Sequence, residues 1–339
     1  MLPIIIAHRG ASGWRPEHTL AAYALAIDQG ADYVEPDLVM TQDGELIARH
    51  ENEIGGATNV ADHPEFAGRR TSKRIDGVEV SGWFSEDFTL AELKTLRARE
   101  RLPQLRPANA AYDGLYEIPT LREIIALVRR KERETGRAIG LYPETKHPSY
   151  FRSIGLPLEQ ALVDILHDNG YRGRMARVFI QSFEVANLQA LATLTEVPLI
   201  QLIDADGGPY DFVIGGDSRS YADLITPAGL AEIAGYAQGI GPDKSLIVPR
   251  DAGQHLLPPT SLVDEAHRVG LRVHPWTFRS ENCFLPVEFR RGDPADFAYL
   301  LQHGDAEAEY RLFFNLGVDG VFSDFPGVAV WVRDKLPRL

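Results

Sequence analysis

Two histidines and an arginine stand directly after short apolar runs of this sequence. His8 and Arg9 follow the run at residues 4–7, and His50 closes a second run that begins at residue 46. An imidazole titrates near pH ~6.5, so one such side chain can accept a proton and another can donate one near neutrality. A single histidine at the end of a strand is more often structural. Two in equivalent places favour acid–base catalysis, with His8 and His50 as the candidate catalytic residues.

Three carboxylates occupy comparable positions. Glu35 and Asp37 are spaced by two within an apolar run, so both face the same side of a strand, and Glu144 precedes Lys146 by two. Salt bridges to Arg9 or Lys146 would explain these acids without any function. Burying three carboxylates together, however, costs several kcal/mol for each uncompensated charge. A divalent cation removes that cost, and an all-oxygen ligand set suits Mg²⁺ or Ca²⁺ better than Zn²⁺.

Basic groups beside such a cation would offset the negative charge that develops on a phosphoryl group. Arg9 and Lys146 are the candidates. Gln181 and Trp276, which also follow apolar runs, join them as candidate substrate-binding residues. Taken alone, Lys146 would be a solvated charge and Trp276 a packing residue. Together with two histidines and three acids, they indicate cleavage of a phosphodiester.

Short apolar runs alternate with segments of helical periodicity over most of the chain, which is typical of a parallel α/β fold. The candidate strands are residues 4–7, 33–39, 46–48, 139–142, 178–180, 199–203, 239–240, 271–273 and 320–322. The third of these returns antiparallel, because the turn at Asp43-Gly44 is too short for a parallel crossover. Eight parallel strands remain, and they predict an α/β fold of the (β/α)8 TIM-barrel type. The active site of such a barrel lies at the rim where the strands end.

A doubly wound open sheet is the competing architecture. It usually has a glycine-rich turn after its first strand, and Ala7-His8-Arg9-Gly10 is not such a turn. Helix ends agree with the barrel. Thr120 and Glu123 form a capping-box pattern that opens a helix closed by Gly136, and further helices are expected at residues 158–169, 259–269 and 307–316, each followed by glycine.

Residues 52–117 interrupt the alternation of strands and helices. They are rich in glycine, proline and charged residues, with one capping-box pattern that begins at Thr89. A structureless loop of this length is improbable inside a compact domain. We therefore predict an inserted subdomain at residues 52–117 and a catalytic barrel made of residues 1–51 and 118–339. A second, shorter insertion is expected at about residues 279–303.

The composition limits the partners of this chain. Its 339 residues carry 35 Lys and Arg against 48 Asp and Glu, a formal net charge of −13, which argues against a nucleic-acid partner. No run approaches the roughly 20 apolar residues that cross a bilayer. Residues 1–7 lack the basic start and long apolar stretch of a signal peptide. A cytoplasmic protein and an exported chain that has already been trimmed both stay open.

Several short motifs follow one another in a fixed order. They are Ile6-Ala7-His8-Arg9-Gly10-Ala11, Pro16-Glu17-His18-Thr19, Glu35-Pro36-Asp37-Leu38, His50-Glu51, Tyr142-Pro143-Glu144-Thr145-Lys146, Gln181-Ser182-Phe183, Gly239-Ile240-Gly241-Pro242, Val273-His274-Pro275-Trp276-Thr277 and Val321-Phe322-Ser323-Asp324-Phe325-Pro326. This ordered set runs from about residue 4 to residue 330. It resembles the glycerophosphodiester phosphodiesterase family, most of all its bacterial periplasmic branch.

The resemblance implies a TIM barrel of the phospholipase C-like phosphodiesterase type with a small inserted subdomain after the hairpin. It implies a phosphoric diester hydrolase of glycerol and lipid metabolism. Such an enzyme converts a small-molecule glycerophosphodiester into sn-glycerol 3-phosphate and an alcohol such as choline, ethanolamine or glycerol. The branch that the sequence resembles also implies a periplasmic location.

The resemblance further implies a role for each candidate residue. These roles are one Ca²⁺ or Mg²⁺ ion bound by Glu35, Asp37 and Glu144, general acid and base at His8 and His50, phosphate contacts from Arg9 and Lys146, an aromatic side chain near the glycerol at Trp276, and Glu17 orienting the loop of the first histidine. His18 stands where many members of the family have Asn, and Glu51 where many have Asp. Contacts around the catalytic groups are therefore expected to differ from those of such members.

Two other functions stay open at this point. The same barrel could act on a lysophospholipid, as a lysophospholipase D-like enzyme, or on another lipid phosphodiester, and Phe284, Leu285 and Phe289 would then be candidates for an apolar rim. A protein that binds a phosphodiester without turnover is the other alternative, although it would not need two histidines for proton transfer. The sequence does not predict the oligomeric state.

Overall fold

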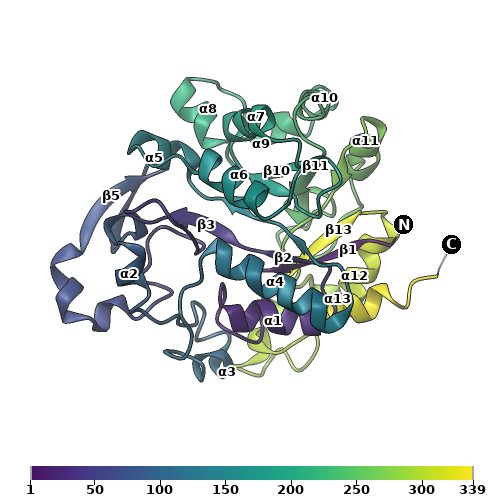
Figure 1. The fold of residues 1–339 in the computed structure, drawn as a ribbon. Coiled ribbons are helices and arrows are strands. Elements are labelled where there is room, and N and C mark those ends of the chain that lie inside the picture. Colours follow the sequence, from purple (N-terminus) through teal and green to yellow (C-terminus); the bar gives the residue numbers. More distant parts are fainter. Residues whose placement is uncertain (1, 338–339) are drawn as a thin grey trace.

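Eight strand positions form a closed parallel barrel in the computed structural model, which describes residues 2–337 (Figure 1). In chain order they are β1 (Ile4–His8), β2 (Tyr33–Glu35) continued by β3 (Asp37–Met40), β7 (Gly140–Leu141) continued by β8 (Glu144–Thr145), β9 (Ile180–Ser182), β10 (Leu199–Ile203), β11 (Gly239–Pro242), β12 (Arg272–Val273) and β13 (Gly320–Ser323). The barrel closes because β13 pairs with β1 and the Asp319 N–H donates to the Val273 carbonyl at the end of β12. The predicted (β/α)8 fold is confirmed.

One helix follows each strand position and covers the outside of the barrel. These helices are α1 (Leu20–Asp28), α4 (Leu121–Thr135), α6 (Leu158–Asp168), α7 (Val185–Leu194), α10 (Pro227–Ile233), α11 (Leu262–Arg268), α12 (Ala306–Asn315) and α13 (Pro326–Arg333), with the shorter α5 (Pro148–Ser153), α8 (Tyr210–Gly215) and α9 (Tyr221–Leu224) between them. The capping box at Thr120 opens α4, and Gly136 closes it in the left-handed conformation that glycine adopts without strain. Among residues 2–337, no helix combines the length and the apolar composition that crossing a bilayer requires.

Prolines break two of the predicted strands. The run at residues 33–39 divides at Pro36, and the run at 139–142 ends at Leu141 because Pro143 separates it from β8. Proline has no N–H to donate to a strand ladder. Glu35 and Asp37 therefore lie on either side of a break. The prediction that both stand on one continuous strand is wrong. β2 pairs with β1 and β7, whereas β3 pairs with β8 and with the hairpin strand β4 (Leu46–Ala48).

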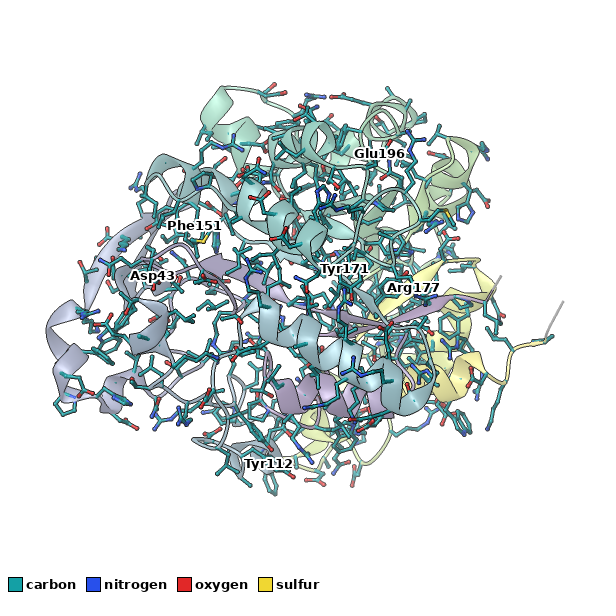
Figure 2. All side chains as sticks on the ribbon, viewed as in Figure 1. Asp43, Tyr112, Phe151, Tyr171, Arg177 and Glu196 are labelled. Carbon is teal, nitrogen blue, oxygen red and sulfur yellow. The ribbon has the colours of Figure 1, made fainter. Side chains whose placement is uncertain are left out.

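The hairpin leads into residues 52–117, which we call the inserted segment. It contains a two-stranded antiparallel sheet of β5 (Thr71–Ile75) and β6 (Val78–Gly82), the short helices α2 (Leu90–Leu93) and α3 (Pro107–Ala110), and 3-10 turns at Val60–Asp62, Pro64–Arg69 and Ser85–Asp87. Figure 1 shows β5 and α2 on the side of the barrel opposite to both chain ends. In Figure 2, Asp43, which follows β3, lies on that same side, whereas Arg177 and Glu196, which precede β9 and β10, lie on the other. The inserted segment therefore covers part of the rim where the strands end.

Apolar side chains form two layers around the strands. One large cluster lies between the strands and the helices, and it includes Ile5, Val34 and Leu141. A smaller cluster comes from the alternate residues of the same strands and fills the inside of the barrel; its members are Ile6, Tyr33, Tyr142, Phe179, Ile200 and Phe322. The barrel is therefore a packed core with an aromatic floor beneath the rim.

The floor leaves no room for a side chain at Gly140. A Cβ atom there would lie 2.0 Å from Cε1 of the buried Tyr33 ring. We expect Gly140→Ala to lower the free energy of unfolding by about 1–3 kcal/mol, because overpacking forces neighbouring side chains out of their preferred rotamers. Gly215→Ala is the matched control, since a Cβ there meets no atom within 4 Å. Urea unfolding of both variants would test this, and equal losses would contradict it.

Candidate active site

Glu35, Asp37 and Glu144 converge at the rim of the barrel. Glu35 ends β2, Asp37 begins β3 and Glu144 begins β8, and Asp37 and Glu144 are direct neighbours in the pairing of those two strands. Each offers one oxygen, these three oxygens lie within 4.8 Å of one another, and all three residues are buried. The break at Pro36 allows Glu35 and Asp37 to face the same point although they pair with different strands.

The negative charges of these three carboxylates repel one another. Burial and the nearby charge of Asp37 raise the pKa of Glu35 well above its ordinary value. Burial, reinforced by Asp37, raises the pKa of Glu144 to about 8. Burial alone would raise the pKa of Asp37 as well, but Arg9 and His18 hold it well below its ordinary value. An arrangement of buried oxygens that resists full ionisation fits a hard divalent cation, which relieves the repulsion that protons would otherwise have to neutralise.

Arg9 contacts two of the three carboxylates, one through its backbone and one through its side chain. Its backbone N–H donates to Glu35 Oε2 at 2.8 Å, and its side-chain Nε lies 3.1 Å from Asp37 Oδ2. The same guanidinium contacts Glu17 through Nη1 at 3.1 Å. Arg9 adopts a left-handed backbone with φ of 60°, an arrangement that non-glycine residues take mainly where surrounding contacts enforce it. Glu17, predicted to orient the loop of His8, pairs with Arg9, the residue next to that histidine.

His8 is held by Asp324. The two are linked by a bond of 2.6 Å between His8 Nδ1 and Asp324 Oδ1. Burial alone would raise the pKa of Asp324, but Arg106 and Arg279 hold it well below its ordinary value. Asp324 is therefore an anion that accepts from Nδ1, which leaves Nε2 as the unprotonated nitrogen. Burial and Arg9 lower the pKa of His8 to about 4, so this imidazole is neutral near pH 7 and can accept a proton.

His50 is held by a chain of hydrogen-bonded side chains in which imidazoles and carboxylates alternate. His50 Nδ1 lies 2.9 Å from Glu51 Oε1, Glu51 Oε2 lies 2.9 Å from His147 Nε2, and His147 Nδ1 lies 2.6 Å from Asp76 Oδ2. Burial, together with Arg9, lowers the pKa of His50 to about 3. Burial alone would lower the pKa of His147, but its two carboxylate partners raise it to about 9. His50 is therefore a neutral imidazole, and His147 is an imidazolium between the carboxyl groups of Glu51 and Asp76.

A cavity of about 590 Å³ opens above these groups. Its lining includes every residue predicted for the site except the buried Asp37, namely His8, Arg9, Glu35, His50, Glu144, Lys146, Gln181 and Trp276. Lys146 Nζ pairs with Glu144 at 2.9 Å, and the indole of Trp276 is fixed by its N–H, which donates to the Gly241 carbonyl at 2.7 Å. Gln181 donates to Glu35 and lies within β9, one residue inside the end of the strand.

Sequence reasoning missed the residues that hold the site in place. Asp324 appears in the sequence analysis only within the last of the ordered motifs, and Arg101, Arg106, His147 and Asp76 do not appear there. The signal for Asp324 is its position directly after the last strand of the barrel, at the edge where the other site residues lie. The remaining four carry no local signal because their partners lie far away in the sequence.

Two further histidines near the rim are structural. His18 Nε2 lies 2.9 Å from Asp37 Oδ2, and its other ring nitrogen bonds the Tyr23 hydroxyl. His18 thus fixes a carboxylate of the acidic cluster, as residues behind metal ligands often do. His274 follows β12 but is buried against the Tyr142 hydroxyl at 2.7 Å inside the barrel. It belongs to the aromatic floor.

Comparison with known proteins gives a consistent result over nearly the whole chain. Residues 8–328 match the model of the glycerophosphoryl diester phosphodiesterase family. The chain is 37% identical to glycerophosphodiester phosphodiesterase GDPD6 of Arabidopsis thaliana, over 96% of this chain and 84% of that protein. It is 30% identical to a glycerophosphodiester phosphodiesterase of Haemophilus influenzae, over 96% of this chain and 88% of that protein.

Solved structures share the fold. A phosphodiesterase of Oleispira antarctica in complex with the product sn-glycerol-3-phosphate matches with a TM-score of 0.62 and 22% identity, over 98% of both chains. A glycerophosphodiester phosphodiesterase of Agrobacterium tumefaciens matches with a TM-score of 0.58 and 18% identity, over 97% of this chain and 100% of that one.

The charged state of His147 predicts a pH dependence of stability. Its folded-state pKa of about 9 exceeds the ordinary value of 6.5, so the folded protein binds this proton more tightly than the unfolded chain does. The contribution of His147 is therefore fully present below pH ~6.5 and is lost as the pH rises through about 9. We expect His147→Gln to cost more unfolding free energy at pH ~6 than at pH ~9.5, as measured by urea titration. A difference that is constant or that grows toward alkaline pH would contradict this.

Proposed function

Because the chain belongs to the glycerophosphoryl diester phosphodiesterase family, we propose that it hydrolyses glycerophosphodiesters by metal-dependent acid–base catalysis with His8 and His50. It is a glycerophosphodiester phosphodiesterase, and the proposal concerns its mechanism and products. One observation carries it: three buried carboxylates and two neutral histidines, each histidine oriented by its own carboxylate, lie together at the rim, and all of them except Asp37 line one cavity. The products would be sn-glycerol 3-phosphate, as in the complex of the Oleispira antarctica relative, and a free alcohol.

Glu35, Asp37 and Glu144 would hold one divalent cation, Ca²⁺ or Mg²⁺. Such an ion supplies positive charge that stabilises a phosphoryl group as negative charge builds on its oxygens. Arg9 and Lys146 line the same cavity, which supports assigning both to the phosphate of the substrate. Gln181 and Trp276 lie on the lining as well, and we assign them to the glycerol part of the substrate.

The two histidines divide the proton transfers between them. One takes the proton from a hydroxyl of the substrate's own glycerol, whose oxygen then attacks phosphorus, while the other gives a proton to the oxygen of the leaving alcohol. Water then opens the resulting cyclic phosphate with the two roles reversed. Direct attack by water on the diester is the alternative route. Trapping of a cyclic phosphate during turnover would distinguish the two routes.

An anionic substrate also prepares a histidine to donate. The positive charges of Arg9 and Lys146 contribute to the low pKa of His50. A bound phosphodiester would neutralise part of that charge, so the pKa of His50 would rise on binding. The same imidazole that is neutral in the free enzyme could therefore carry a proton in the substrate complex.

A lipid substrate was the alternative function on the same barrel. Leu285 is buried, and Phe284 and Phe289 are half-buried, so the three residues suggested for an apolar rim are mainly packed within the protein. Phe284 alone of the three lines the cavity. Rates on glycerophosphocholine and on a lysophospholipid would decide between the two substrates, and we expect the water-soluble diester to react faster.

Loss of either histidine should remove most of the activity. Positioned acid–base groups contribute about 10²–10⁴-fold to a rate, so we expect His8→Ala and His50→Ala each to lower kcat by that range. Release of sn-glycerol 3-phosphate measures the effect. His255→Ala is the matched control, because His255 pairs with Glu288 on the surface, outside the cavity. Near-normal kcat in both active-site variants would refute the assignment.

Removal of divalent cations should abolish turnover. We expect a chelator to stop glycerol 3-phosphate release and added Ca²⁺ or Mg²⁺ to restore it. Binding should also raise the thermal midpoint of the wild type, because a ligand that binds only the folded state stabilises it. Glu144→Gln should lose the midpoint shift, whereas the exposed Glu117→Gln should keep it. An active, chelator-treated enzyme that shows no shift would contradict a metal-dependent mechanism.

A further inference from the structure

We propose that the inserted segment positions three groups of the active site, namely His50, His8 and Arg9, through one charged contact for each. Asp76, Arg106 and Arg101 of this segment are then positioning residues for the reaction, although none of them is assigned to the substrate or its chemistry. The inference rests on the proposed function, because it assumes that the two histidines transfer protons and that Arg9 binds phosphate.

The first contact reaches His50 from the β5–β6 hairpin. Asp76 stands in the turn between the two strands, and its Oδ2 bonds His147 Nδ1 at 2.6 Å. The other ring nitrogen of His147 bonds Glu51, and Glu51 in turn bonds the Nδ1 nitrogen of His50 at 2.9 Å. Both Asp76 and His147 have positive φ, 45° and 48°, so the backbone on each side of the contact is held in a conformation that non-glycine residues rarely adopt.

The second contact reaches His8 from the region of α3. Arg106 Nη2 bonds Asp324 Oδ2 at 2.6 Å, while the other oxygen of Asp324 bonds His8. Arg106 is itself fixed by Glu281 at 2.8 Å and by the carbonyl of Ser12 at 3.1 Å. The side chains of Arg106 and Asp324 are 6% and 3% exposed, so little solvent screens this interaction.

The third contact reaches Arg9. Arg101 Nε bonds Glu17 Oε1 at 3.0 Å, and Glu17 Oε2 bonds Arg9 Nη1 at 3.1 Å. Arg101 also belongs to the lining of the rim cavity. The guanidinium of Arg9 is thereby held between Glu17 on one side and Asp37 on the other.

The three contacts share one arrangement. In each, a carboxylate stands between a charged side chain and a reacting or phosphate-binding group: Glu51 between His147 and His50, Asp324 between Arg106 and His8, and Glu17 between Arg101 and Arg9. A carboxylate has two oxygens, so it can bond a partner on each side and transmit a fixed orientation from one to the other. Small errors in the placement of catalytic groups reduce rates strongly, so orientation of this kind affects turnover directly.

Attachment of the segment does not by itself require these charged contacts. Burying charged pairs contributes little net stability, and apolar contacts would hold a subdomain equally well. Other charges of the segment do not reach the site: Arg69 bonds Glu92 and the Asp87 carbonyl within residues 52–117, and Lys94 pairs with Glu123 of α4, which does not line the cavity. Placing Asp76, Arg101 and Arg106 against groups next to catalytic residues therefore serves orientation more than adhesion.

Each contact has its own kinetic signature. Asp76→Asn and Arg106→Gln should lower kcat by about 10–100-fold, the usual effect of losing a group that orients an active-site residue, with little change in KM. Arg101→Gln should act mainly on KM, because Arg9 binds the substrate. Arg106→Lys should recover part of the lost kcat. Arg69→Gln is the matched control, since it removes a guanidinium of the same segment that contacts no active-site group.

An activated substrate separates orientation of a histidine from loss of structure. An aryl glycerophosphodiester has a leaving group that departs without a proton, so it needs the base but not the acid. We expect one of the two variants, Asp76→Asn or Arg106→Gln, to regain near-wild-type kcat on the aryl diester, and the other to stay slow. The variant that recovers identifies which histidine is the general acid in the first step.

The outcomes discriminate between the two proposals. If His8→Ala and His50→Ala are active, the mechanism itself fails. If those variants are inactive but Asp76→Asn and Arg106→Gln match Arg69→Gln on both substrates, the mechanism stands and the positioning role is wrong. Equal losses on alkyl and aryl diesters in both variants, in proportion to a lower folded fraction by circular dichroism, would also overturn it. Should Arg106→Gln fail to fold, Arg106→Lys and Asp76→Asn carry the same comparison.

Discussion

Three carboxylates buried within reach of one point are the constraint on which the rim of this barrel depends. Glu35, Asp37 and Glu144 raise one another's energy through burial and like charge. Without compensation, such a cluster would take up protons or disperse. Arg9 and Lys146 stand against two of the acids and supply part of that compensation. A phosphodiester would add negative charge to this site. The positive charges of Arg9 and Lys146, which already lie beside the acids, would offset part of it.

The rest of the fold keeps that cluster rigid. The breaks at Pro36 and Pro143 allow β2–β3 and β7–β8 to direct acids from different pairing partners to one place. Beneath them the aromatic floor, with Tyr33 and Tyr142 against Phe179 and Phe322, closes the barrel. The polar rim therefore lies on a close-packed apolar layer, which leaves no space for the polar side chains to shift into the barrel and keeps water from reaching them through it.

The sequence pattern predicted those features of the fold that depend on residues close together in the chain. Strand ends, the hairpin at Asp43-Gly44 and the capping box at Thr120 follow from residue types a few positions apart, and the structure contains each of them. The convergence of Glu35, Asp37 and Glu144 followed from the barrel once its strands were known. Partners such as His8 and Asp324 lie 316 residues apart, and Arg106 and Asp324 218 apart. No periodicity connects residues at that separation, so the contacts that orient the histidines could be found only in three dimensions.

The inserted segment shows why such contacts matter more for chemistry than for folding. The strand ladder of the barrel closes entirely through residues outside 52–117, from β13 to β1 and onward. Apolar packing could attach a subdomain to this barrel, but it is non-directional and tolerates sliding. An ion pair through a carboxylate fixes distance and direction together. His8 and His50 line the rim cavity beyond the strand ends, so a neighbouring segment that fixes the direction of their rings matters most there. Asp76 and Arg106 act on them from two different parts of the inserted segment.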